Sequence, residues 1–246
     1  AQTGRPAAEN QATPPIALPV PRDTRSDGGE TRTAEEKQSQ SGGKQASAKP
    51  RSVPQGKGFD FYVLSLSWSP SYCEAEGADP IRQQCDAGRP YAFVVHGLWP
   101  QFERGYPEDC RTDEPSVPNE TLRTLYDIMP SAGLIRHEWT QHGTCSGLSQ
   151  ADYFRVLRAA REAVTIPAEY RRLDGYKTLD PDEAERAFLS ANPGLLGAGV
   201  AVTCDKRYLR EVRICMDKGL GFRTCPEVDR RACRLDRVVM PPVRGG

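Results

Sequence analysis

Eight cysteines constrain this chain more than any other feature, because all of them lie within residues 58–246. They are Cys73, Cys85, Cys110, Cys145, Cys204, Cys215, Cys225 and Cys233. An even number suits a set of disulfides, although eight cysteines permit 105 pairings and spacing does not choose among them. Zinc sites are the alternative, but the chain has no Cys-x-x-Cys pair and only three histidines. We therefore expect four disulfides and an oxidising compartment.

The first 57 residues differ in composition from the rest of the chain. They contain no cysteine, histidine or aromatic residue and are rich in Ala, Gln, Gly, Pro, Ser and Thr. Such a segment cannot bury enough apolar surface to offset the entropy lost on ordering. We expect a disordered polar tail or linker over 1–57 and one domain over 58–246, a usual domain size.

Charge and hydropathy exclude several classes of protein. The formal net charge is zero, and nine of the basic but only six of the acidic residues lie in 1–57, so the domain carries a slight negative charge. A protein that grips long duplexes through phosphates is more basic. The sequence contains no run of about 20 apolar residues, which is the length that a membrane-spanning helix needs. The chain starts without Met, which favours a secreted or periplasmic protein whose signal peptide has been removed.

The order of elements predicts an α+β domain. Strands are expected over 59–68, 91–95, 199–204, 208–216 and 235–240, and helices over 119–129, 132–143, from Ser149 to about 164, and from Asp180 to before Pro193. Strands at both ends with helices clustered between them are typical of that class.

All three histidines fall in two short segments, His96-Gly-Leu-Trp-Pro-Gln101 and His137-Glu-Trp-Thr-Gln-His-Gly-Thr-Cys145. A zinc protease would need two histidines four residues apart on one helical face. Here they are five apart, which turns the rings roughly 140° from each other on a regular helix. Glu138 and His142 do share a face, so a carboxylate can orient that imidazole for acid–base work. A nucleophilic Cys145 is disfavoured, because eight cysteines paired in disulfides leave no free thiol. A Ser–His–Asp hydrolase is disfavoured because the sequence has no Gly-x-Ser-x-Gly motif.

Cleavage of RNA suits this inventory. RNA supplies its own nucleophile, the 2′-hydroxyl, so an enzyme needs a base, an acid and donors to the phosphorane. Two imidazoles with ordinary pKa values near 6.5 can supply both protonation states at once. Structural histidines in the core or on the surface are the alternative interpretation.

The two segments resemble those of the ribonuclease T2 family, which read His-Gly-Leu-Trp-Pro and His-Glu-Trp-x-Lys-His-Gly-Thr-Cys. Weaker similarity extends over about 59–240 and includes Ser67-Trp-Ser-Pro-Ser-Tyr-Cys73. The resemblance implies an α+β fold around an antiparallel sheet with helices packed to one side. It also implies an endoribonuclease of low base specificity that acts without metal or other cofactor and forms a 2′,3′-cyclic phosphate.

The same resemblance assigns roles to residues. His96 and His142 would be the acid–base pair, with His142 as base and His96 as acid. His137 would bind the phosphate, and Glu138 would stabilise the transition state. Trp99 and Tyr106 are candidates for stacking a base of single-stranded RNA, although core packing explains Trp99 equally well. The implied disulfides are Cys73–Cys85, Cys110–Cys145, Cys204–Cys233 and Cys215–Cys225.

One position departs from the family pattern. Gln141 stands where the family has Lys, so a charged donor to substrate is replaced by a neutral one. Charge-assisted hydrogen bonds are roughly twice as strong as neutral ones, so a loss of about 10²-fold in rate is expected. An inactive RNA-binding member is the alternative function, but the retained histidines favour an active ribonuclease. No exposed heptad pattern argues for assembly, so we expect a monomer.

Overall fold

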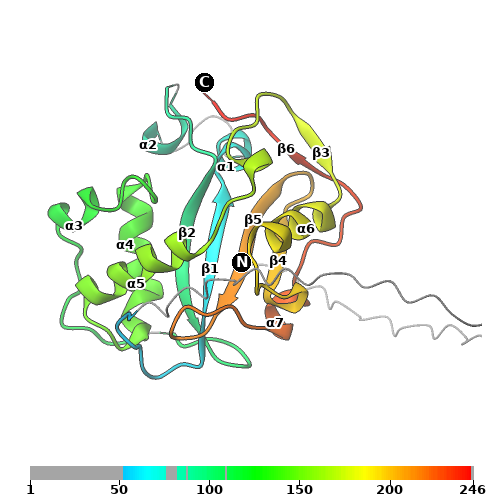
Figure 1. Cartoon of the computed structure of the whole chain (residues 1–246). Helices are drawn as coiled ribbons and strands as arrows, with labels where there is room; N and C mark the ends of the chain where they lie inside the picture. Colours follow the sequence, from blue (N-terminus) through cyan, green and yellow to red (C-terminus); the bar gives the residue numbers. More distant parts are fainter. Residues whose placement is uncertain (1–51, 76–81, 87, 109, 245–246) are drawn as a thin grey trace, which may run out of the picture. The chain divides into compact units, whose positions relative to one another are not determined.

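Four strands form an antiparallel sheet in the order β2-β1-β5-β4 in the computed structural model of the chain (Figure 1). The structure describes residues 52–75, 82–86, 88–108 and 110–244. The strand bounds are β1 Phe61–Trp68, β2 Phe93–Gln101, β4 Val200–Cys204 and β5 Leu209–Met216. A separate two-stranded sheet pairs β3 Lys177–Leu179 with β6 Val238–Met240. The expected α+β fold is confirmed.

Seven α-helices occur in the described ranges, mostly between β2 and β4. They are α1 Ser69–Ala75, α2 Arg82–Cys85, α3 Asn119–Arg123, α4 Ala132–Gln141, α5 Gln150–Ala163, α6 Pro181–Ala191 and α7 Pro226–Asp229. The side chains of Ser131, Ser149 and Asp180 cap the N-termini of α4, α5 and α6 by accepting backbone N–H bonds. None of the helices in these ranges is both long and apolar enough to cross a lipid bilayer.

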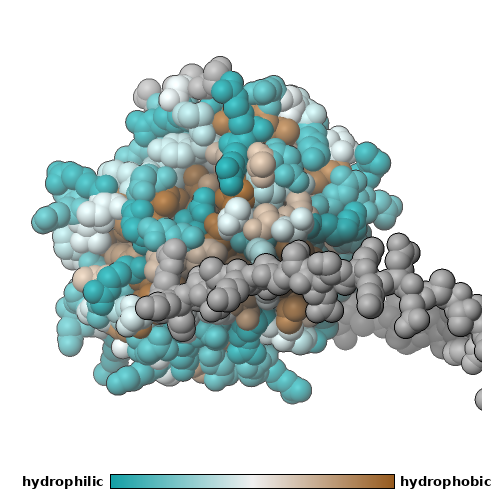
Figure 2. Space-filling model, viewed as in Figure 1, coloured by the Kyte–Doolittle hydropathy of each residue, from teal (hydrophilic) through white to brown (hydrophobic). Residues whose placement is uncertain are grey.

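The main core lies on one face of the four-stranded sheet. In β1 the alternate residues Tyr62, Leu64, Leu66 and Trp68 are fully buried and belong to the same apolar cluster as residues of α5 and α6. These helices cover that face, as the layers in Figure 1 show, and the short α7 packs a residue, Val228, against the opposite one. In the view of Figure 2 the described surface is largely hydrophilic, with apolar residues scattered. The apolar cluster on the opposite face of the sheet is small, so that face can carry polar groups.

All eight cysteines form disulfides, with the pairing that the family resemblance implies. Cα–Cα distances of 5.1–6.2 Å lie in the usual range for such bridges. The pairs are Cys73–Cys85, Cys110–Cys145, Cys204–Cys233 and Cys215–Cys225. The Cys110–Cys145 bridge joins the loop after β2 to the 3₁₀ turn Gly143–Ser146, which follows α4.

Several expected elements have different bounds in the structure, among them the last strand, which was expected over 235–240 and covers only Val238–Met240. The second strand does not stop at residue 95 but runs through the whole His96–Gln101 segment. The helix expected over 119–129 ends at Arg123, where the Thr124 hydroxyl bonds the carbonyl of Thr121 and competes with the helical ladder. The helix expected to reach residue 143 ends at Gln141.

The proposed tail boundary falls partly outside the described residues, which begin at 52. Residues 52–57 are described, and they contact the domain. Lys57 N donates to Ser146 O at 2.9 Å, and Val53 packs against the main core. The described residues belong to a unit that spans 48–246.

Candidate active site

A β-bulge in β2 sets the direction of His96. In the pairing with β1, Gly97 lies opposite Ser65 while Val95 lies opposite Leu66, so His96 is the additional residue. Such a bulge shifts the alternation of the strand by one. Val95 and Leu98 therefore both face the core, whereas His96 and Trp99 face the opposite side. The sheet presents its polar groups on this second face.

Helix α4 approaches β2 closely at Gly97. A Cβ at this position would lie 1.9 Å from Glu138 Oε2 and 2.4 Å from Trp99 Nε1, well inside any real contact distance. Only glycine leaves room for the carboxylate. The buried Glu138 then accepts a hydrogen bond from Trp99 Nε1 at 2.7 Å, and its Oε1 lies 3.5 Å from His96 Nε2.

Trp99 lies between the two histidine segments. Its ring centroid is 5.4 Å from that of His96 and 5.4 Å from that of His142. Its apolar edge also packs against a small cluster that contains Phe61 and Val63. Trp99 therefore packs in a small core and also lines the site, in agreement with both interpretations of this residue. The fold brings the two imidazoles, which are distant in the sequence, against the same indole.

Burial and neighbouring charges shift the titration of these groups in different directions. Burial raises the pKa of Glu138 to about 7, against the opposing effects of the His96 charge and the Trp99 hydrogen bond. Burial together with the charges of His137 and His96 lowers the pKa of His142 to about 4. Burial lowers the pKa of His96, but the hydrogen bond and charge of Glu211 and the charge of Glu138 outweigh it and raise the pKa overall.

The expected pairing of Glu138 with His142 is wrong. The helix ends at Gln141, and His142 has φ −125° and ψ −47°, outside the helical range. The i,i+4 alignment therefore fails in the last turn, and Glu138 contacts His96 and Trp99 instead.

Two site residues escaped the sequence analysis, Glu211 and Arg213 on β5. The carboxylate of Glu211 bonds Nδ1 of His96 through Oε1 and receives two hydrogen bonds from Arg213 through Oε2, at 2.9 and 2.7 Å. Burial alone would raise the pKa of Glu211, but His96 and Arg213 lower it to about 2. The available signal was their spacing, since two charges at i and i+2 in an apolar strand share one face.

The remaining predicted residues line two cavities or lie beside them. His137 is exposed and lines a cavity of about 350 Å³ together with His96, Glu211 and Arg210. Tyr106 lines a second cavity of about 180 Å³ with Trp99 and His142. Gln141 is exposed at the end of α4 and lines neither cavity.

The site has little to hold a metal ion. Among the described residues, no three His, Cys, Asp or Glu side chains gather in a way that could bind one. The arrangement offers instead two imidazoles with opposite pKa shifts, a third that is exposed, and a buried carboxyl. These groups can accept and donate protons around one bound substrate group.

The family model described as the Ribonuclease T2 family matches residues 59–225. A ribonuclease of Aeromonas hydrophila is 38% identical over 187 residues, which is 72% of this chain and 82% of that protein. Among solved structures, RNase NT in complex with 5′-AMP has a TM-score of 0.53 and 26% identity, and the match covers 69% of this chain and 92% of that chain.

An RNase-related protein from Calystegia sepium has a higher TM-score of 0.60, covering 75% of this chain and 98% of that chain. At 22% identity this second structure bears on the fold alone. The family model covers more than half of the sequence, including both histidine segments. This chain therefore belongs to the ribonuclease T2 family.

Proposed function

We propose that this protein cleaves single-stranded RNA by transphosphorylation, without a metal, through a 2′,3′-cyclic phosphate. Family membership makes it an endoribonuclease. One observation carries the finer proposal: His96 and His142 flank the same indole, and their pKa values are shifted in opposite directions. Such a pair can hold one neutral and one charged imidazole at the same pH.

The shifts favour His142 as base and His96 as acid. Neutral His142 takes the proton of the 2′-hydroxyl, and the oxygen attacks phosphorus. The bond from phosphorus to the 5′-oxygen breaks, and protonated His96 gives its Nε2 proton to that oxygen. The products are a 2′,3′-cyclic phosphate and a free 5′-hydroxyl. Hydrolysis of the cyclic phosphate uses the two groups in reversed roles.

His137 and Glu138 are suited to the phosphoryl oxygens. Exposed His137 can donate to them from the larger cavity. The raised pKa of Glu138 leaves its carboxyl protonated in acid, and a neutral carboxyl donates a hydrogen bond without repelling the phosphorane. Trp99 and Tyr106 offer aromatic surface for a base beside His142.

The pH dependence follows from the directions in which the pKa values of His142 and His96 are shifted. A base whose pKa is lowered to about 4 is active above that pH, so kcat/KM rises through about pH 4. An acid whose pKa is raised stays protonated beyond the ordinary histidine range, so kcat/KM falls only at higher pH. Above about pH 7, ionisation of Glu138 adds to the loss. We predict a bell-shaped profile with its maximum on the acidic side.

The disulfides support a location in an oxidising compartment. Four bridges close all eight thiols, and such bridges persist outside the reducing cytosol. We propose that the protein acts after export, as a secreted or periplasmic monomer.

The test is cleavage of RNA and of DNA of the same sequence in excess EDTA, with analysis of the product ends. We expect cyclic-phosphate ends from RNA and no cleavage of DNA, which lacks the 2′-hydroxyl. His142→Ala should lower kcat by about 10²–10⁴-fold. Loss of activity in EDTA would point to a metal enzyme. Equal, negligible turnover by the intact protein and His142→Ala would favour the RNA-binding alternative.

A further inference from the structure

We propose that Glu211 is the positioning residue of His96, fixing the imidazole so that Nε2 faces the substrate, and that Arg213 holds Glu211 in place. The inference rests on the proposed function of His96 as acid. It concerns residues outside both histidine segments, on a strand that is not adjacent to β2 in the sheet.

The contact spans a strand. His96 comes from β2 and Glu211 from β5, and β1 lies between them. On the second face, β1 presents Ser65 and Ser67, which lie opposite Arg213 and Glu211 respectively in the register with β5. Both are small, and Ser65 is fully buried with its hydroxyl unpaired. The side chains of His96 and Glu211 can therefore meet above β1, whereas a larger residue in place of either serine would separate them.

Arg213 fixes the carboxylate from the other side. Its guanidinium donates two hydrogen bonds to Glu211 Oε2, which leaves Oε1 for His96 Nδ1. The guanidinium carbon lies 5.0 Å from the centroid of the Trp99 ring, so Arg213 is itself held against the indole. Glu211 is largely buried, and so its orientation is set by these partners rather than by solvent.

The arrangement determines what Nε2 can do. With Nδ1 bonded to Glu211, Nε2 is the nitrogen left for substrate, and it lies on the side of Glu138. The charges that face His96 are those of Glu211 and Arg213 from β5 and Glu138 from α4, and His142 is near enough for its pKa to be lowered by the His96 charge. Glu211 favours the imidazolium, whereas Arg213 opposes it.

Two charge-removing variants separate these effects. Glu211→Gln keeps an acceptor for Nδ1 but removes the negative charge, so the pKa of His96 should fall. Arg213→Gln leaves a shorter side chain with an amide donor on the same face as Glu211 but removes the positive charge, so the pKa of His96 should rise. The chain has only three histidines, so NMR titration of the free protein can follow each imidazole, with assignment from single His substitutions.

The titration does not depend on turnover, so it separates this inference from the proposed function. Shifts of opposite sign support the inference, whereas unchanged values or shifts of the same sign in both variants overturn it. A merely structural role would change unfolding but not produce opposite shifts. Should Glu211→Gln fail to fold, an unshifted or lowered His96 pKa in Arg213→Gln still refutes the proposal.

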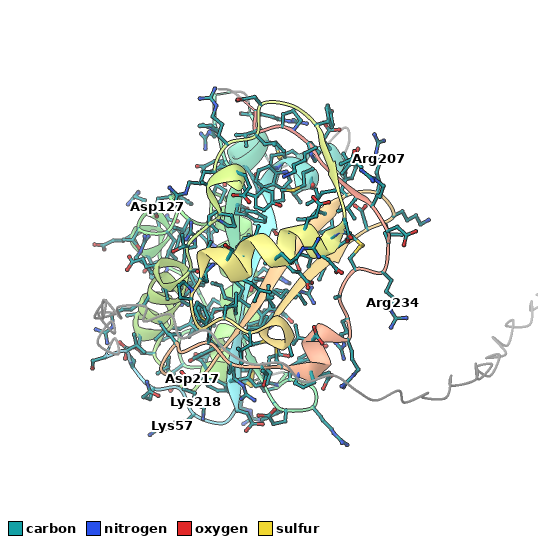
Figure 3. The ribbon with its side chains drawn as sticks, turned by 45° about the vertical axis from the view of Figure 1, so that its right-hand side comes forward. Lys57, Asp127, Arg207, Asp217, Lys218 and Arg234 are labelled. Atoms are coloured by element: carbon teal, nitrogen blue, oxygen red, sulfur yellow. A yellow bond between two sulfur atoms is a disulfide. The ribbon has the colours of Figure 1, made fainter. Side chains whose placement is uncertain are left out.

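Activity supplies a second measurement. In Glu211→Gln the alkaline limb of kcat/KM should move to lower pH while acidic activity is retained. Glu211→Ala also removes the orienting bond, so kcat should fall about 10- to 100-fold at every pH. Asp127→Asn is the matched control, because it breaks a carboxylate–arginine pair with Arg158 on the helical side of the molecule (Figure 3). That control should leave the profile unchanged; equal losses in Glu211→Gln and Glu211→Ala would contradict the separate role of charge.

Discussion

Gln141 is the one predicted site residue that departs from the family pattern, and we expect it to lower the rate. The family pattern has Lys at this position. Arg136 is a nearby cation that could replace it, but its side chain points elsewhere. Arg136 donates to Asn119 Oδ1 at 3.3 Å, toward the start of α3. The phosphoryl group therefore lacks a lysine at the end of α4, next to His142.

We predict that Gln141→Lys raises kcat on polynucleotide RNA. The gain should be about tenfold, less than for a buried donor, because residue 141 is exposed and water screens its charge. Thr140→Lys is the matched control, since it adds the same charge at an exposed position roughly 100° around the helix. Steady-state kinetics of both variants at low salt make the comparison.

Equal gains in the two variants would mean that general attraction of RNA, and not a specific donor, limits the rate. No gain in Gln141→Lys would show that this position does not reach the phosphate.

At the residue scale, sequence reasoning found the titrating groups but not all of their partners. His96, Glu138 and His142 could be identified because they lie in two dense segments. Glu211 lies 115 residues from His96 and meets it across β1, a contact that local spacing does not encode. The pairing of Glu138 was mistaken because one helical residue more or less changes the direction of a side chain by about 100°.

At the scale of elements, β2 carries the strictest local requirement. It must pack Val95 and Leu98 into the core while turning His96 and Trp99 outward, which a regular strand cannot do. The bulge resolves this conflict, and Gly97 beside it lets α4 approach. Aromatic and β-branched residues predicted β1, and capping residues predicted α5 and α6. A bulge has no comparable signal in a single sequence, so the extent of β2 was missed.

Gly97→Ala should therefore lower both stability and activity, although it adds only one methyl group. The added methyl would overlap Glu138 Oε2, so α4 must move away from β2. We expect unfolding to become easier by about 1–3 kcal/mol and kcat to fall, because Glu138 and Trp99 lose their alignment. Urea denaturation and steady-state kinetics measure the two effects.

Gly133→Ala is the control for this substitution. Gly133 lies in the first turn of α4, and its new Cβ would meet only Ser131 Oγ, at 3.7 Å. Alanine favours a helix over glycine by about 1 kcal/mol, so this variant should be as stable as the parent or more so. A Gly97→Ala protein with unchanged stability would show that α4 is not seated against β2 as described.

At the scale of the whole molecule, the disulfides and the sheet join segments that are distant in the sequence. The Cys110–Cys145 bridge connects the loop after the first histidine segment to the end of the second. Family resemblance supplied this pairing, because eight cysteines by themselves allow too many arrangements. Composition predicts that the tail ends at residue 57 and the domain begins at 58, but it cannot show that residues 52–57 lie against the domain.

Two truncations test where the folded unit begins. A chain that starts at residue 52 should unfold at the same temperature as the full chain, because the polar composition of 1–51 gives it little apolar surface to bury. A chain that starts at residue 58 loses the bond from Lys57 N to Ser146 O and that from Gln55 Nε2 to Lys218 O. Figure 3 shows Lys57 and Lys218 at the same end of the molecule.

The shorter chain also loses the packing of Val53 and the close approach of Lys57 to Gly147, where a Cβ would lie 2.8 Å from the Lys57 carbonyl oxygen. We expect it to be less stable by about 1–2 kcal/mol, as measured by thermal and urea unfolding. Equal stability of the two truncated chains would place the domain boundary at residue 58, as composition alone predicts. A loss already present in the chain that starts at 52 would mean that the segment before it contributes to the fold.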